Sequence, residues 1–141
     1  MPRPEQIIAV VREWIEKADN DLKNAAHTLA LGAEGPTDTI CFHSQQCVEK
    51  YLKAFLVFTG INFPKTHDIE ELMNLIPDRS RPELSIQDLR RLTAYATVTR
   101  YPGGYEPIKL SETRTAVKLA RRIRKAIRGH LPKEVLQHGR K

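Results

Sequence analysis

The sequence has few features that stabilise a fold by means other than an apolar core. It contains two cysteines in 141 residues, Cys41 and Cys47, six positions apart on one predicted helix. That spacing does not suit a disulfide, and no second cysteine pair could complete a zinc site. No apolar run approaches the roughly 20 residues that span a bilayer, and the N-terminus lacks the layout of a signal peptide. We therefore expect buried free thiols and a cytoplasmic protein without a membrane span.

Signatures of the common enzyme classes are also missing. The chain has no phosphate-binding glycine loop, no dinucleotide-binding glycine pattern and no nucleophile elbow. Aspartates are sparse, so the chain alone is not expected to hold the magnesium ions of nucleotidyl transfer. We expect no metal and no cofactor.

Acidic residues are scarce in the second half of the chain. Residues 1–70 carry seven Lys/Arg and ten Asp/Glu, whereas residues 71–141 carry sixteen and seven, so the net charge of +6 arises in the second half. No acid lies between Thr113 and Lys133. This stretch suits the phosphates of nucleic acid or of a nucleotidyl ligand, but the solvated face of an amphipathic helix explains it equally. Its basic residues are Arg114, Lys118, Arg121, Arg122, Arg124, Lys125 and Arg128.

Apolar residues recur at three- and four-residue steps along most of the chain, which predicts helices and no strands. The helices are expected at about 5–31, 37–60, 66–76, 85–98 and 111–129. Gly60 is the predicted end of the second helix, and Thr66 the predicted N-cap of the third. The fold class is therefore all-α. We expect an up-and-down bundle of about five helices in residues 1–131, followed by a basic flexible tail at 132–141.

The second predicted helix carries two incompatible faces. Its apolar face demands burial and contains Ile40, Cys41, Val48, Tyr51, Leu52, Phe55 and Leu56. A second line recurs at the same helical steps and contains His43, Gln46, Lys50 and Lys53. A helix this apolar should lie inside the bundle, so the polar line faces either a seam between subunits or a ligand. For Lys53, an ion pair with Glu49 four residues earlier is the structural alternative.

A second candidate site is the segment RYPGGY, which begins at Arg100 and Tyr101. A guanidinium group binds phosphate oxygens in a planar fork, and an aromatic ring can stack on a nucleobase. The segment therefore suits a nucleotide. Alternatively, Arg100 caps helix carbonyls and the tyrosines pack against the bundle.

Several segments together resemble the HEPN family, small helical domains named for nucleotide binding in higher eukaryotes and prokaryotes. The resemblance is carried by WIEKADNDL at 14–22, HSQQCVEKYLKAFLVFTG at 43–60, KTHDI at 65–69 and RYP at 100–102. It covers roughly residues 8–128, nearly the whole chain. It implies a helical bundle whose partner is a separate small nucleotidyltransferase, often from a neighbouring gene, in a two-component or toxin–antitoxin-like system.

The resemblance also raises the alternative of a metal-independent ribonuclease toxin. HEPN nucleases carry an Arg followed, after four to six residues, by a His, and two copies meet across a dimer. Arg124 and His130 are the only pair with this spacing, but they lie at the end of the last predicted helix. The family motif is expected near Arg100, where no His follows for about thirty residues. A third alternative is a helical interaction scaffold.

We therefore expect a homodimer that binds a nucleotide or small substrate and works with a separate nucleotidyltransferase. RNA is an alternative ligand. No catalytic residue is assigned beyond the weak candidates Arg124 and His130. Lys50, Lys53 and Arg100 are expected to neutralise phosphate. His43 and Gln46 are expected to orient polar groups, and Tyr101 to stack or line the site.

Overall fold

The computed structural model describes residues 3–97 and 107–137. Within these residues the chain forms six α-helices, two short 3-10 helices and no strand, which confirms the all-α prediction. Among them, no helix combines the length and apolar composition needed to cross a membrane. The elements are α1 (Pro4–Leu29), η1 (Gly32–Glu34), α2 (Thr37–Thr59), α3 (Ile69–Leu75), η2 (Asp78–Ser80), α4 (Ile86–Ala94), α5 (Leu110–Arg128) and α6 (Lys133–Leu136).

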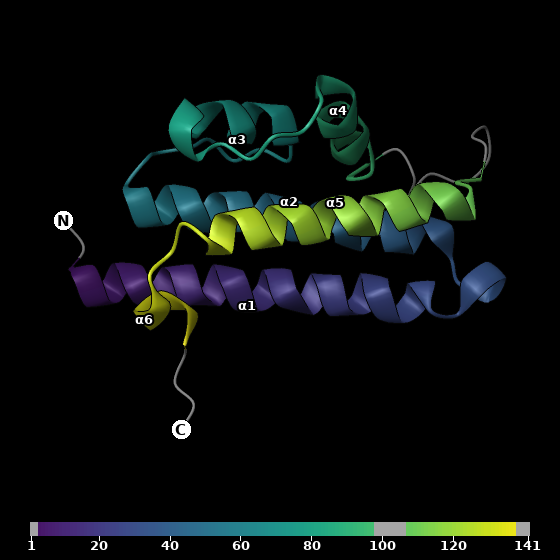
Figure 1. Cartoon of the computed structure of the whole chain (residues 1–141), viewed down its shortest axis with the longest axis horizontal. Helices are drawn as coiled ribbons and strands as arrows, with labels where there is room; N and C mark the ends of the chain where they lie inside the picture. The colour runs from purple at the N-terminus through teal and green to yellow at the C-terminus, as the bar shows by residue number, and fades with distance from the viewer. Residues whose placement is uncertain (1–2, 98–106, 138–141) are drawn as a thin grey trace.

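Three long helices form the body of the bundle (Figure 1). Helices α1 and α2 run antiparallel and pack along their length, and α5 packs against both of them. The shorter helices α3 and α4 cover α2 on the side away from α1, and α6 lies against α1. Helix α2 is therefore the central element, in contact with α1, α3, α4 and α5.

The central position of α2 confirms the prediction that its apolar face is buried. Tyr51, Leu52 and Leu56 are fully buried. Each aliphatic side chain buried in this way contributes about 1.5–3 kcal/mol to folding. Cys41 and Cys47 are free and buried, as predicted, and burial raises the pKa of the Cys41 thiol to about 12.

The helix ends follow local capping chemistry, with one correction. Gly60 adopts φ 76°, a left-handed conformation that suits glycine, and ends α2 as predicted. The predicted N-cap of α3, Thr66, is wrong. Asp68 caps this helix, because its carboxylate accepts a hydrogen bond from the Glu71 amide at 3.2 Å, while the Thr66 hydroxyl accepts from the Asp68 amide.

The chain after Pro132 begins with a helix that the sequence did not suggest. Leu131 and Val135 lie one turn apart and are 7% and 1% exposed, so they anchor α6 to the core. The expected flexible tail at 132–141 therefore starts with helical residues, and its last four, 138–141, lie outside the described residues.

Candidate functional site

Three carboxylates organise the polar side chains of α2. Two of them, Asp19 and Asp21, come from α1, and the third, Glu49, comes from α2 itself. Throughout the described part of the chain, every buried side-chain nitrogen or oxygen has a hydrogen-bond partner. The buried polar atoms of α2 thus find their partners within one chain, and a seam between subunits is not needed to satisfy them.

The Asp21 cluster joins α1 to the edge of α2. Asp21 Oδ1 lies 2.8 Å from His43 Nδ1, and its Oδ2 accepts a hydrogen bond from Lys50 Nζ at 2.6 Å. His43 and Lys50 are two helical turns apart on the same side of α2, so one carboxylate can hold both. The two side chains are 24% and 21% exposed. Each retains polar N–H or ring-nitrogen positions without a partner among the residues described.

The Glu49 cluster lies on the neighbouring side of α2. Glu49 Oε1 accepts a hydrogen bond from Gln45 Nε2 and lies 2.9 Å from His67 Nδ1. Its Oε2 accepts from Lys53 Nζ at 2.8 Å. Gln46 joins the cluster because its Nε2 donates to Gln45 Oε1 at 2.7 Å. The carboxylate is therefore fully engaged by groups that stabilise its charged form.

Burial and hydrogen bonding act on Glu49 in opposite directions. Burial raises its pKa, but the hydrogen bonds from Lys53, His67 and Gln45 outweigh this and hold the pKa below its usual value. The Lys53 ammonium also lies 5.7 Å from the Trp14 ring centroid and 5.8 Å from that of Phe63, within cation–π range. The Lys53 side chain is only 9% exposed. The structural alternative to a ligand-binding role for Lys53, an ion pair with Glu49, is therefore present and buried.

The Asp19 cluster joins α1, α2 and α5. Asp19 Oδ1 accepts hydrogen bonds from Tyr51 Oη at 2.5 Å and from Arg124 Nε at 2.9 Å. Burial and the nearby Asp19 carboxylate raise the pKa of Tyr51, so it stays a hydroxyl donor. Arg128 lies further away, 3.7 Å from Asp19 Oδ2 and 3.4 Å from Tyr51 Oη.

The structure brings together some of the predicted site residues. His43 and Lys50 share Asp21, whereas Gln46 and Lys53 belong to the Glu49 cluster. Arg100 lies outside the described residues, as does Tyr101. Across 3–97 and 107–137, no group of three or more His, Cys, Asp or Glu side chains could hold a metal ion.

Arg124 and His130 have different surroundings. Arg124 donates to Asp19 between α1 and α5, whereas the His130 ring packs edge-on against Phe55, with 6.1 Å between centroids. His130 also lines a hollow beside residues 82–84. No described contact joins the two side chains.

Asp19, Asp21 and Gln45 were not identified from the sequence as site residues, and Arg128 was named only as part of the basic stretch of the last predicted helix. Asp19 and Asp21 belong to the WIEKADNDL segment that marks the first helix, but they pair with residues 22 to 32 positions later on α2, and Asp19 also pairs with Arg124, 105 positions later. The sequence offered one signal for these contacts, the separation of Asp19 and Asp21 by two positions on the same predicted helix. Two residues correspond to about 200° around a helix, so the two carboxylates must meet α2 from different sides.

Comparisons with known proteins agree with this fold. The family model described as the HEPN domain matches residues 11–130. The crystal structure of TT1696 from Thermus thermophilus is similar, with 26% identity, a TM-score of 0.72, and coverage of 86% of this chain and 98% of that one. So is ST0689, described as an archaeal HEPN homologue, with 28% identity, a TM-score of 0.63, and coverage of 92% and 98%. A comparison with curated proteins found no match.

Glu49→Gln is expected to destabilise the fold by about 3 kcal/mol at pH 7, because it leaves the Lys53 ammonium buried without a counter-charge. Glu70→Gln is the matched control. Glu70 pairs with Arg90, whose side chain is 69% exposed, so its loss should cost less than about 1 kcal/mol. Chemical denaturation measures both values.

The same variant predicts a pH dependence. The folded-state pKa of Glu49 lies below the ordinary value of 4.5, so its stabilising contribution is complete above that pH and is lost as the pH falls through the folded-state pKa. The difference in stability between the wild type and Glu49→Gln should therefore narrow in that acidic range. A difference that stays constant from pH 7 to pH 3 would contradict the assignment.

Proposed function

The chain belongs to the HEPN family, and from this premise we propose that it is a non-catalytic protein that binds a nucleotide or small substrate for a separate small nucleotidyltransferase, in a toxin–antitoxin-like pair. The observation that supports this proposal is the Asp21 cluster. It places a histidine and a lysine at a partly open edge of α2 and fixes both before any ligand arrives.

The cluster has donors that suit a phosphate group. Lys50 carries three N–H donors and uses one on Asp21, and His43 uses Nδ1 and keeps Nε2. A phosphate oxygen is an acceptor for both groups. Because Asp21 already orders the two side chains, ligand binding costs less side-chain entropy than it would with free ones.

The other predicted contacts take different parts in this proposal. Gln46 belongs to the neighbouring Glu49 cluster, one helical turn after His43 along α2, and is proposed to orient polar groups of the ligand. Lys53 acts as a positioning residue, because it is enclosed by aromatic rings and holds Glu49. Arg100 and Tyr101 supply the planar phosphate contact and the stacking ring, as the RYPGGY segment suggests.

The geometry of the described residues gives no support to the ribonuclease alternative. Acid–base cleavage of RNA needs an Arg and a His that reach the same phosphodiester. Arg124 is instead engaged by Asp19, and His130 packs on Phe55. In the proposal, the chemistry is therefore done by the partner protein, while this chain presents the substrate.

Lys50→Met is expected to weaken binding of a nucleoside triphosphate by roughly ten- to a hundredfold, because one charge-assisted contact is worth about 1.5–3 kcal/mol. Lys118→Met removes the same charge from the exposed face of α5 and is expected to change affinity little. Calorimetric titration with purine and pyrimidine nucleotides measures both. The proposal fails if the folded wild type binds none of them, or if Lys118→Met weakens binding as much as Lys50→Met does.

Assembly as a homodimer is part of the same proposal, and an apolar depression on α1 supports it. The depression has a volume of about 230 Å³ and is lined by Val10, Glu13, Trp14 and Lys17. Val10 is 44% exposed, which is high for a large apolar side chain on an amphipathic helix. A second copy of the chain would cover it.

Light scattering at micromolar concentration is expected to give twice the chain mass of 16.1 kDa. Val10→Glu should shift the protein toward the monomer and leave its helical circular dichroism unchanged, since it places a charge in the depression. A wild type that scatters only as 16.1 kDa would rule out the dimer.

A further inference from the structure

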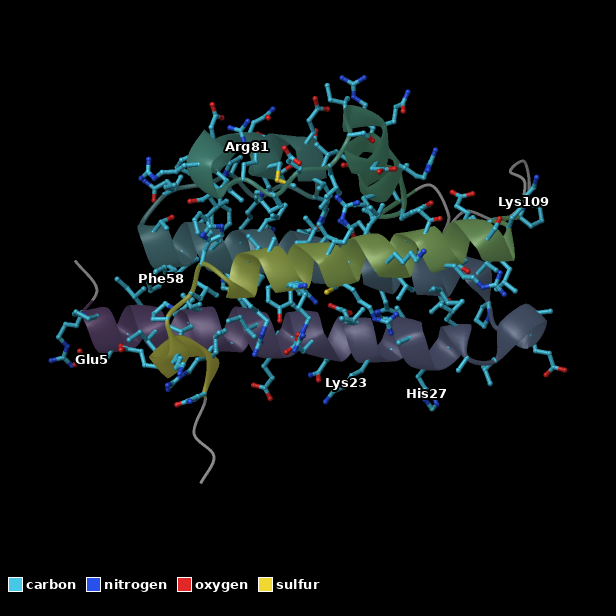
Figure 2. All side chains as sticks on the ribbon, in the orientation of Figure 1. Glu5, Lys23, His27, Phe58, Arg81 and Lys109 are labelled. Atoms are coloured by element: carbon cyan, nitrogen blue, oxygen red, sulfur yellow. The ribbon has the colours of Figure 1, made fainter. Side chains whose placement is uncertain are left out.

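A second polar cleft lies between α1, α5 and α6, with a volume of about 270 Å³. Three cationic side chains line it, Arg12 and Lys23 from α1 and Arg128 from α5. Figure 2 shows Lys23 projecting from α1 away from α2 and α5, which places its ammonium group at the outer rim.

The cleft is separate from the Asp21 cluster. It is lined by Asp19, which lies two residues from Asp21 and therefore about 200° away around α1. Asp19 contacts Tyr51 and Arg124, toward α5, whereas Asp21 contacts the far edge of α2. A ligand in the cleft would not occupy the site proposed above.

The positive charges of the cleft are only partly compensated. The Arg12 guanidinium donates to the backbone carbonyls of Glu134 and Val135, the latter at 3.3 Å, and these carry partial charges only. Arg12 and Lys23 have no carboxylate partner within residues 3–97 and 107–137. Arg128 has its nearest acceptors at 3.4 and 3.7 Å, longer than the roughly 2.7–2.9 Å of a charge-assisted hydrogen bond.

The floor of the cleft does not cancel this charge. Asp19 is engaged by Arg124 as well as by Tyr51, so its negative charge is already balanced. Glu16, the other carboxylate of the lining, is exposed, so water weakens its effect without removing it, and it offsets only one of the three positive charges. An anion that entered the cleft would thus meet three cations with N–H donors to spare.

We propose that this cleft binds a phosphate monoester group, held by Arg12 and Arg128 and attracted by Lys23. The chemistry fits because guanidinium groups recognise phosphate oxygens through pairs of N–H donors. The size permits this, because about 270 Å³ lies just below the roughly 300–1,000 Å³ of pockets for drug-sized ligands and is ample for a phosphate group. Arg12 also connects the site to α6, since it holds the carbonyl groups of that helix.

Nuclear magnetic resonance of the arginine Nε–Hε groups tests the site in the folded full-length protein. Inorganic phosphate is titrated at constant ionic strength. The signals of Arg12 and Arg128 are expected to shift and saturate together, while that of Arg114 on the exposed face of α5 does not. Absence of a saturable shift at Arg12 and Arg128 would overturn the proposal.

Matched variants separate a built site from diffuse attraction. Lys23→Met should weaken phosphate binding about fivefold, and Glu16→Gln should strengthen it, because each changes the charge at the rim. Lys118→Met should leave the phosphate binding measured at the Arg12 and Arg128 signals unchanged, since Lys118 lies on the exposed face of α5. An equal loss with Lys118→Met would show non-specific attraction and would overturn the proposal.

A parallel titration with adenosine 5′-monophosphate identifies the source of the phosphate. Tighter binding than inorganic phosphate, with the same arginine shifts, indicates a nucleotide whose nucleoside lies outside the cleft. Equal binding indicates the free ion, and both results support the site. Shifts confined to residues outside the cleft would overturn it.

Discussion

Carboxylates set against a buried helix are the constraint on which the rest of this structure depends. Helix α2 supplies much of the core, yet it also carries His43, Lys50 and Lys53. A charged group loses several kcal/mol of hydration when it is buried, so it must be paired or stay neutral. Asp21 and Glu49 provide that pairing, and the Asp21 contacts also fix how α1 and α2 lie against each other.

The arrangement has two functional consequences, one on each side of α1. On the Asp21 side, the paired residues keep donors at a partly open edge, where we propose the nucleotide. On the Asp19 side, the carboxylate is balanced by Arg124, so Arg12 and Arg128 remain available around a small cleft. The two candidate phosphate sites therefore arise in different ways: Asp21 orders His43 and Lys50 directly, whereas in the cleft Arg12 is held by carbonyl groups of α6.

Much of the fold could be predicted because helical periodicity is a local property. The five longer helices, the glycine end of α2 and the buried thiols followed from spacing alone. The pairing of His43 and Lys50 with Asp21 did not, because those contacts span 22 and 29 residues and depend on the relative rotation of two helices. Helix α6 was also missed, since four residues are too few to show a period. The sequence predicted that the polar line faces a seam between subunits or a ligand. In the structure, His43 and Lys50 pair with Asp21 on α1, whereas Gln46 and Lys53 contact residues of α2 itself.

A double-mutant cycle between Asp21 and Lys50 tests this account most directly. The free energy of unfolding is measured for the wild type, Asp21→Asn, Lys50→Met and the double variant. If Asp21 orders the donors of α2, the two substitutions are coupled by at least about 1 kcal/mol, so that the second costs much less once the first has been made. A coupling energy near zero would show that the two charges are independent and would contradict the account.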